Sequence, residues 1–429
     1  MGPSIGLYPS PIIILWTSLH ALSHRERAQR HAPRSRHGLQ HTIVLDPCIA
    51  LCLLGQGAAF RDGANDKSRE DLVRAKALFV TSIAITALAA PLSAKARPFE
   101  DPRAALNPAI DADTAFQAEP RDPACHAAVM ASTGGALPKN PRTLAVRWTG
   151  YGNFELAYNG QIVLLDAYFD RGSLYPSLGF KAADIKKADA ILIGHGHHDH
   201  MSDAASVGAR TGATVVGAPV TTEKLATQQI DAKQVRTVTG RGGEMLQLGA
   251  FRVEPILGEH GDPPAALVGA FDAALKATTT PPTPEQTAEQ ATIRQRGTQD
   301  RRVRSEGTIA YLITLDNGFR IMYRDSGGRV TDFEKAAMQR AGRVDLGLIA
   351  VSAAYLNSAT VEQALEHVRT YKPDVYMPAH HDAPFNNLWR ATEPLFQAVK
   401  DDNPRIVTVS KGYREPTCFN TEHNISRSR

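Results

Sequence analysis

The sequence predicts a mixed α/β (α+β) fold, in which strands paired as hairpins precede alternating strands and helices. The pair Asn159-Gly160 separates two alternating apolar runs, and Asp316-Asn-Gly318 separates two others. Such turn residues between apolar runs are a strong hairpin signal. Beyond residue 330, apolar runs alternate with segments of helical periodicity, as in β-α units. The combination indicates sheets layered against helices.

The first regular element is expected at Thr143. Short apolar runs bounded by turn residues predict strands, and apolar residues that recur every three to four positions predict helices. The predicted strands are 143–148, 154–158, 161–165, 190–194, 213–217, 235–238, 251–256, 308–315, 319–323, 346–351 and 375–377, and the predicted helices are 332–341 and 360–371.

Residues 261–306 interrupt this order with Pro-rich, Ala-rich and Gln/Arg-rich stretches. An insertion of that length within a domain is usually a functional loop or a disordered one. We expect a lid over the functional site, in which the amphipathic piece Ala265–Lys276 covers an apolar substrate. The alternative is a solvated linker without a role. The residues expected to attract an anionic group are Arg294, Arg296, Arg301, Arg302 and Arg304.

The N-terminal 96 residues have the composition of leader sequence. From Val73, a basic start, the apolar run Ala77 to Leu92 and the sequence Ser93-Ala-Lys-Ala96 match the three regions of a secretory signal peptide. We therefore expect a periplasmic or secreted protein. The apolar run is too short to favour a permanent membrane anchor. Residues 1–72 are interpreted as a mis-annotated extension upstream of the true start, and the alternative is a genuine long extension.

These patterns divide the chain into five parts. They are the extension 1–72, the signal peptide 73–96, an irregular N-terminal arm 97–142, the folded domain 143–415 with its insertion, and a C-terminal tail 416–429. Cys125 and Cys418 are the two cysteines outside the leader. In an exported protein such a pair predicts a disulfide, whereas two buried thiols are the alternative.

The positive net charge of +4 belongs to the leader. Residues 1–96 carry 11 Lys and Arg against 6 Asp and Glu, whereas the rest of the chain carries 37 against 38. A near-neutral body lacks the basic surface of a typical nucleic-acid binder. We therefore expect a small-molecule substrate and no nucleic-acid partner. The oligomeric state is not predicted.

Four histidines and an aspartate follow the predicted strand 190–194 in the run His195-Gly-His197-His-Asp199-His200. Residues i and i+2 of an extended backbone face the same way, so His195 and His197 can hold one ion. Where the chain turns, Asp199 and His200 can point to a neighbouring ion. Imidazole and carboxylate suit zinc, and also iron, manganese or nickel. A polar loop with incidental histidines explains this density poorly.

The run resembles the His-x-His-x-Asp-His motif of the metallo-β-lactamase superfamily, and the resemblance extends from about Thr143 to Ser410. The segments 148–154 and 162–166 are similar to the family's opening hairpin and first aspartate. The later motifs, in the family's order, are Gly258-Glu-His260, Met322-Tyr-Arg-Asp325-Ser-Gly-Gly and Tyr376-Met-Pro-Ala-His380. The residues of these motifs are most similar to those of the branch that contains ascorbate-6-phosphate lactonase and N-acylphosphatidylethanolamine phospholipase D. The resemblance implies a four-layer αββα sandwich.

The resemblance also implies a centre of two divalent metal ions, with zinc expected first. One ion would bind His195, His197 and His260, the second would bind Asp199, His200 and His380, and Asp325 would bridge them. The neighbour His381 is an alternative to His380, although the family wording Pro-x-His favours His380. Asp166 is expected to orient the His-rich loop from behind the ligands, and His198 is expected to face away.

The implied activity is hydrolysis by a metal-bound hydroxide, because the ion lowers the pKa of bound water to roughly 7. Asp199, or a displaced water, would pass a proton to the leaving group. A bridging aspartate such as Asp325 accompanies phosphodiesterases, lactonases and thioester hydrolases in this family, which argues against β-lactam hydrolysis. We expect a phosphodiester or lactone/ester substrate. The alternatives are a mono-iron dioxygenase of the same fold and a non-catalytic metal-binding protein.

The leader analysis predicts that the mature protein begins close to Arg97, after Ala94-Lys-Ala96. N-terminal sequencing or mass spectrometry of protein recovered from the periplasm measures this directly. Native protein that contains residues 1–72 would contradict the predicted start.

Overall fold

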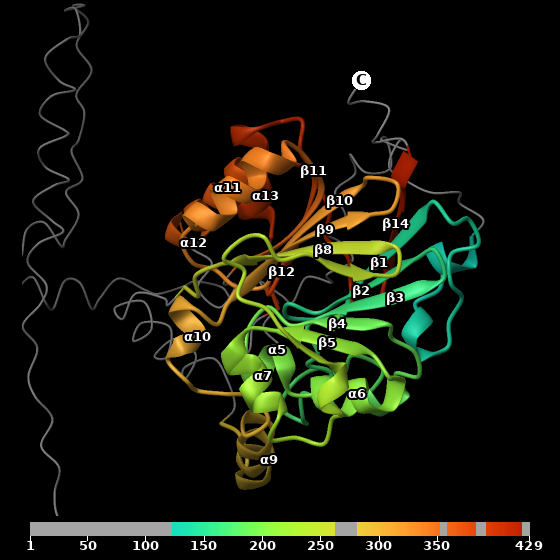
Figure 1. The fold of residues 1–429 in the computed structure, drawn as a ribbon, viewed down its shortest axis with the longest axis vertical. Coiled ribbons are helices and arrows are strands. Elements are labelled where there is room, and N and C mark those ends of the chain that lie inside the picture. Colours follow the sequence, from blue (N-terminus) through green and yellow to red (C-terminus); the bar gives the residue numbers. More distant parts are fainter. Residues whose placement is uncertain (1–121, 262–280, 352–357, 383–391, 423–429) are drawn as a thin grey trace, which may run out of the picture. The chain divides into compact units, whose positions relative to one another are not determined.

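Two seven-stranded sheets pack face to face, and helices cover the outer face of each sheet (Figure 1). The computed structural model describes residues 122–261, 281–351, 358–382 and 392–422. The four layers confirm the expected αββα sandwich. Within these ranges, none of the helices is both long and apolar enough to cross a membrane.

The first sheet joins antiparallel hairpins to a parallel half. Its strands, in spatial order, are β14 (Pro416–Asn420), β1 (Thr143–Trp148), β2 (Phe154–Tyr158), β3 (Gln161–Leu165), β4 (Ala190–Leu192), β5 (Thr214–Gly217) and β6 (Val235–Thr237). β14 through β3 are antiparallel neighbours, and β3 through β6 are parallel. The hairpin predicted at Asn159-Gly160 is confirmed. Both residues have positive φ, 46° and 77°, as a tight hairpin turn requires.

The second sheet has the same mixed design. Its strands, in spatial order, are β13 (Val407–Thr408), β12 (Pro373–Ala379), β11 (Val344–Ala350), β10 (Arg320–Arg324), β9 (Ile309–Leu315), β8 (Phe251–Leu257) and β7 (Leu246–Leu248). β7 through β10 are antiparallel neighbours, and β10 through β13 are parallel. The predicted turn at 316–318 joins β9 to β10, with Leu315 N donating to Phe319 O at 2.8 Å.

The helices lie in two groups. On the first sheet lie α5 (His198–Met201), α6 (Ala204–Thr211) and α7 (Pro219–Leu225), and on the second lie α11 (Asp332–Ala341), α12 (Ser358–Tyr371) and α13 (Glu393–Asp402). The range of α11 is the one predicted. Its start is fixed by Thr331, which accepts from Glu334 N while the Glu334 carboxylate accepts from Thr331 N, a reciprocal N-terminal cap.

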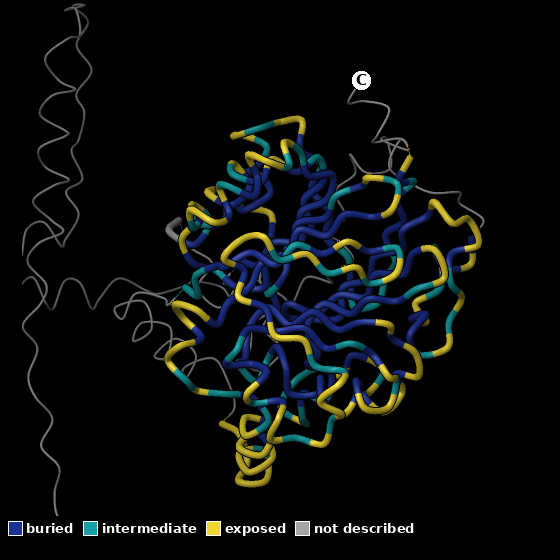
Figure 2. Tube along the Cα trace, viewed as in Figure 1, coloured by how far each residue is buried: buried dark blue, intermediate teal, exposed yellow. Residues whose placement is uncertain are grey.

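The main apolar core lies between the two sheets, and the strands there are buried on both faces (Figure 2). Aromatic pairs mark the contact. Phe154 of β2 meets Tyr323 of β10 at a centroid distance of 6.5 Å, and Tyr158 meets Phe251 at 6.0 Å. Two further clusters of buried apolar residues pack the helices onto the outer faces.

The C-terminal boundary predicted from sequence is wrong. Residues 416–429 were expected to form a tail, but Pro416–Asn420 forms β14 and pairs with β1 along its length. This edge strand is short and its partner begins more than 270 residues earlier, so no local pattern reveals it. The helix α13 and the strands β7 and β13 were also not predicted, and the two strands are only three and two residues long.

The described part of the N-terminal arm, residues 122–142, contains two 3-10 turns, η3 (Pro123–Cys125) and η4 (Ala131–Thr133). A fully buried ion pair, Arg147 to Glu155 at 3.1 Å, holds the arm against the sheet. Arg147 Nη2 donates to Ala124 O at 2.6 Å. The Glu155 carboxylate accepts from the backbone of Ala131 and Ser132 at 3.1 and 2.8 Å.

The predicted disulfide between Cys125 and Cys418 is confirmed, with the two Cα atoms 5.7 Å apart. It ties η3 of the arm to β14. The arm and the C-terminal edge strand are therefore fixed to each other by a covalent bond across a separation of 293 residues.

Loss of this bridge is expected to lower the free energy of unfolding by roughly 2–5 kcal/mol, because the unfolded chain regains the entropy of a long open loop. Chemical denaturation of the double variant Cys125→Ala/Cys418→Ala against the wild type measures the difference. Intact mass before and after reduction and alkylation tests the bridge itself. Two free thiols in the native protein would contradict the structure.

Candidate metal centre

The His-rich run lies where β4 ends and α5 begins. His195 is almost fully buried, and its segment is held to β9 by a bridge to Thr308 and by a hydrogen bond from Ile309 N to Gly194 O at 2.7 Å. His197 is extended, with φ −68° and ψ 155°, directly before α5. Asp199 and His200 then lie in the first turn of that helix. The extended-then-turned backbone is the one that the sequence predicted.

The remaining candidate ligands follow strands of the second sheet. His260 comes three residues after β8, Asp325 directly follows β10, and His380 directly follows β12. The strand pairings make β8, β10 and β12 run in one direction. Their C-terminal ends therefore share one edge of the sheet, and the three side chains meet the His-rich loop there.

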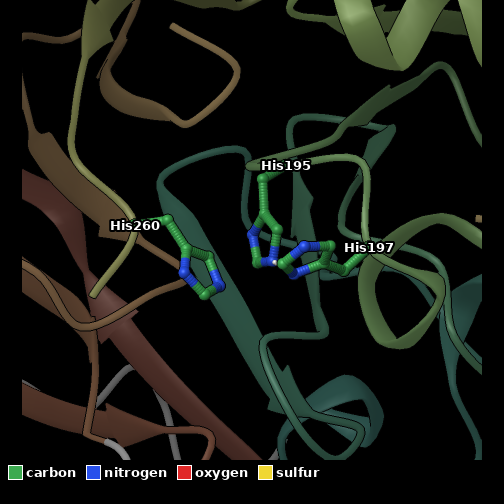
Figure 3. A group of neighbouring side chains, drawn as sticks. All are labelled: His195, His197 and His260. Carbon is green, nitrogen blue, oxygen red and sulfur yellow. Dashed lines mark hydrogen bonds between the residues drawn. The ribbon is translucent and has the colours of Figure 1, made fainter. Parts of the chain in front are cut away.

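All seven predicted ligands gather in three overlapping groups, in each of which the ligand atoms lie within 4.8 Å of one another. The groups are His195/His197/His260, Asp199/His200/His380 and His195/His200/Asp325. Figure 3 shows the side chains of the first group converging, with His195 and His197 on the loop after β4 and His260 on the loop after β8. That these residues bind metal stays a prediction, which is taken up under the proposed function.

Asp325 lies between the other two groups. Its Oδ2 is 2.6 Å from His195 Nδ1 and 3.3 Å from His200 Nδ1. In the second group, Asp199 Oδ2 is 3.6 Å from His200 Nε2 and 3.5 Å from His380 Nε2. A carboxylate between two sets of donors is the arrangement that a bridging ligand requires.

His380, and not His381, faces this cluster. His380 has a positive φ of 59°, and its N donates to Tyr151 O at 2.7 Å. The His381 ring is buried and stacks on Trp148 at a centroid distance of 4.0 Å. It belongs to none of the three groups, so the geometry agrees with the choice of His380.

Asp166 has the supporting position expected of it. Its Oδ2 is 2.5 Å from His200 Nδ1, and its Oδ1 accepts from Gly194 N at 2.9 Å. The residue is fully buried and has a positive φ of 56°, a strained backbone that is common at functional sites. Holding His200 by Nδ1 leaves Nε2 directed toward Asp199. His198, as expected, lies outside the three groups.

Burial and mutual repulsion keep several imidazoles neutral. Burial, with the charges of His200, His197 and His260, lowers the pKa of His195 well below its ordinary value. Burial and His197 lower the pKa of His260 to about 3. Burial also lowers the pKa of His197. Neutral imidazole is the form that coordinates metal.

The carboxylates respond differently to the same surroundings. Burial raises the pKa of Asp325, although the charges of His200 and Arg324 oppose it. Burial alone would also raise the pKa of Asp199, but His200 and His380 hold it well below its usual range. Asp199 is therefore ionised, and its side chain keeps 22% exposure.

The donor set fits a divalent cation. His260 Nδ1 and Asp325 Oδ1 are buried and have no hydrogen-bond partner among the residues that the structure describes. Buried polar atoms are rarely left unpaired. Imidazole nitrogens and carboxylate oxygens at this density are the ligands of zinc, iron, manganese and nickel sites.

Two supports of the site were not predicted from sequence. Arg324, directly before Asp325, is fully buried, with Nε 3.0 Å from Glu334 Oε1 and Nη2 donating to Glu259 O at 2.6 Å. Asp382, two residues after His380, accepts from Tyr151 N at 2.9 Å and pairs with Arg171 at 2.8 Å. Arg324 and Asp382 lie beside the motif residues in the sequence, which could have indicated a supporting role. Only the tertiary structure shows that their charges are buried.

The described part of the insertion, residues 281–306, packs beside the His-rich run. It contains α9 (Pro284–Arg294) and α10 (Arg302–Ser305). Thr298 N donates to Gly196 O at 2.7 Å, and Arg296 pairs with the buried Asp203 at 2.8 Å. These contacts show that this part of the insertion is packed against the domain, and its role as a lid stays a prediction. The piece Ala265–Lys276 lies outside the described residues.

The helix α9 was detectable from its first residues. Pro284 takes the first helical position, and Thr283 and Gln286 form a reciprocal cap, which is a known N-terminal signature. The expectation that all five arginines would attract an anion is wrong for two of them. Arg296 is paired with Asp203, and Arg302 is paired with Glu223 and Asp300, each at 2.6 Å.

Comparison with known proteins gives consistent matches. Residues 161–381, more than half of the chain, match the family model described as the beta-lactamase superfamily domain. The chain is 22% identical over 270 residues to a UPF0173 metal-dependent hydrolase of Polynucleobacter asymbioticus, which covers 62% of this chain and 83% of that relative. A relative of the same description from Dinoroseobacter shibae is 29% identical over 117 residues, or 27% of this chain and 49% of its own length.

A solved structure matches more distantly. A metallo hydrolase from Ignicoccus hospitalis superposes with a TM-score of 0.46 at 16% identity, covering 65% of this chain and 98% of that one.

The site geometry makes Gly152 a sensitive position. A methyl group there would lie 2.4 Å from Asp166 Oδ2 and 3.1 Å from His200 Nδ1. We expect Gly152→Ala to displace this pair and to weaken metal binding roughly 10–100-fold, as measured by competition with a chelating dye. The control is Gly412→Ala, whose methyl would meet only the end of the Glu415 side chain at 3.3 Å. Unchanged affinity in Gly152→Ala would refute the supporting role of Asp166.

Proposed function

Because the chain belongs to the metallo-β-lactamase superfamily, we propose that it is a metal-dependent hydrolase of small-molecule ester, lactone or phosphodiester bonds. The observation that carries the proposal is the convergence of three ligand groups on Asp325, His195 and His200. Its relatives are described as metal-dependent hydrolases, which supports the reaction class but does not specify the scissile bond.

In the proposed centre, the seven residues hold two divalent cations. Zinc is the first choice, and iron, manganese and nickel are the alternatives. His195, His197 and His260 form one ligand set, Asp199, His200 and His380 form the other, and Asp325 joins them. Bound divalent cations make a water nucleophilic near neutral pH and stabilise negative charge that develops on the substrate. The buried, unpartnered Asp325 Oδ1 and His260 Nδ1 support this assignment, since each is left without a proton donor or acceptor.

Asp199 is the proposed proton carrier. It is the carboxylate of the centre that is partly exposed, at 22%, whereas the side chains of Asp325 and Asp166 are fully buried. Its low pKa keeps it ionised, so it can accept a proton from the attacking water, and because it is a weak base it would hold that proton only transiently. From this open position it would transfer that proton to the leaving group.

We also propose that the protein acts in the periplasm or outside the cell. The signal-like sequence 73–96 and the Cys125–Cys418 bridge support this location, because disulfides persist in oxidising compartments. The near-neutral composition of residues 97–429 supports a small-molecule substrate over a nucleic acid.

A metal and substrate screen tests the reaction class. Protein stripped with a chelator is reloaded separately with zinc, iron, manganese or nickel. Each form is then assayed on chromogenic phosphodiesters, lactones, carboxylic esters and β-lactams, with and without oxygen. Oxygen-independent turnover of an ester, lactone or phosphodiester supports the proposal. Oxygen-dependent turnover by the iron form alone would identify a dioxygenase, and tight metal binding without turnover would identify a metal-binding protein.

The choice between neighbouring histidines gives a further prediction. We expect His380→Ala to lose about one bound ion per chain by elemental analysis, with a parallel loss of turnover, because a ligand is removed. His381→Gln, which changes the ring stacked on Trp148, should keep its metal. Loss of metal from His381→Gln together with a full complement in His380→Ala would reverse the assignment.

A further inference from the structure

One face of α9 lies against the metal centre. Gln290, Ile293, Arg294 and Gly297 recur at the spacing that places residues on one side of a helix. Gln290 is buried and donates to Arg171 O at 2.7 Å. Ile293 is buried in a cluster with Tyr151 and Tyr168. A Cβ on Gly297 would lie 2.3 Å from His198 N, so that the chain after α9 touches the His-rich run.

Arg294 shares this face, but its side chain is exposed. Within the described ranges, no hydrogen bond or ion pair engages its guanidinium. It is close enough to act electrostatically on Tyr175. The Tyr175 ring meets the Tyr151 ring at a centroid distance of 6.4 Å, and Tyr151 in turn meets the candidate ligand His380. Burial raises the pKa of Tyr175, and a hydrogen bond with Tyr151 and the Arg294 charge oppose that rise.

Aromatic side chains connect α9 with the candidate ligands, through Ile293 of that helix. Tyr151 meets His380 at a centroid distance of 4.8 Å and Tyr168 at 5.2 Å, and Tyr168 meets His198 at 5.9 Å. The Tyr168 hydroxyl is buried and has no hydrogen-bond partner among the described residues. An apolar wall with an unsatisfied hydroxyl and an unpaired cation at its rim is typical of a small-molecule site.

We propose that Arg294 is a specificity-determining residue, which binds a carboxylate or phosphate group that the substrate carries away from the scissile bond. The inference rests on the proposed function, since it places the scissile bond at the cluster of His195, Asp199 and Asp325. The substrates are then small organic anions. The guanidinium suits either group, because both accept its paired N–H donors.

The alternative is a purely structural role, in which the charge of Arg294 stabilises the C-terminal end of α9. That role would alter stability and would leave ligand selectivity unchanged. Arg301 offers a matched control. It lies in the same insertion, is exposed, and the structure gives its side chain no hydrogen bond or ion pair with described residues.

Equilibrium binding to the metal-loaded protein tests the proposal without turnover. Linear dicarboxylates from succinate to pimelate are titrated calorimetrically against monocarboxylates of the same chain length. One carboxylate can bind at the metal centre, and the second can reach Arg294. The wild type should prefer one dicarboxylate length. Arg294→Gln should weaken that ligand about tenfold, a change of about 1.4 kcal/mol, and leave the monocarboxylate unchanged. Arg301→Gln should change neither.

Phosphate as the distal group is tested with the matching ω-phosphonocarboxylates, which separates the two anion classes. Equal weakening in Arg294→Gln and Arg301→Gln, or none in either, would overturn the proposal. The same experiments distinguish failure of the proposed function from failure of the anion-site proposal. A wild-type protein that prefers one dicarboxylate but hydrolyses none of the substrates would refute the hydrolase function and leave the anion-site proposal standing. Hydrolysis without any anion preference would refute only the anion site.

Discussion

The carboxylate of Asp325 is fully buried among imidazoles, and the rest of the fold is arranged around this burial. Removing a carboxylate from water costs several kcal/mol unless opposite charge or hydrogen bonds compensate it. His195 at 2.6 Å and His200 at 3.3 Å supply part of that compensation, and Asp166 holds His200 in turn. Asp325 follows β10, His195 follows β4, Asp166 follows β3, and His200 lies in α5. The cluster can therefore exist only where the C-terminal ends of strands from both sheets meet.

A second layer of buried charge keeps those strand ends in place. Arg324 connects the segment after β10 with the carbonyl before His260 and with Glu334 of α11. The Tyr371 hydroxyl of α12 donates to the same Glu334 at 2.5 Å. Asp382 performs a similar task for the segment after β12, through Tyr151 N, Arg171 and the Tyr413 hydroxyl. Breaking such a buried pair leaves an uncompensated charge, so each resists displacement of the ligands that it supports.

Residues 281–306 of the insertion extend this framework beyond the candidate ligands. Arg296 neutralises Asp203, which also accepts from the backbone of Phe169 and Asp170 at 2.7 and 2.8 Å. The same segment carries α9, whose buried residues meet Tyr151 and Tyr168. Its sequence is dominated by Gln, Thr, Arg and Pro, yet Thr298 is hydrogen-bonded to Gly196 of the loop that holds Asp199. The helix α9 is therefore fixed relative to the candidate metal centre.

The sequence by itself determined the local pieces: the hairpin at Asn159-Gly160, the helix 332–341, and the His-rich run placed directly after a strand. Turn preferences, caps and periodicity act over a few residues, so they can be read before the fold is known. It also predicted the Cys125–Cys418 bridge, from cysteine count and compartment. Only the tertiary structure decided that residues 416–420 complete the first sheet, that His380 and not His381 faces Asp199, and that α9 lies against the centre. Those outcomes depend on burial and pairing between segments as much as 270 residues apart, which no local pattern encodes.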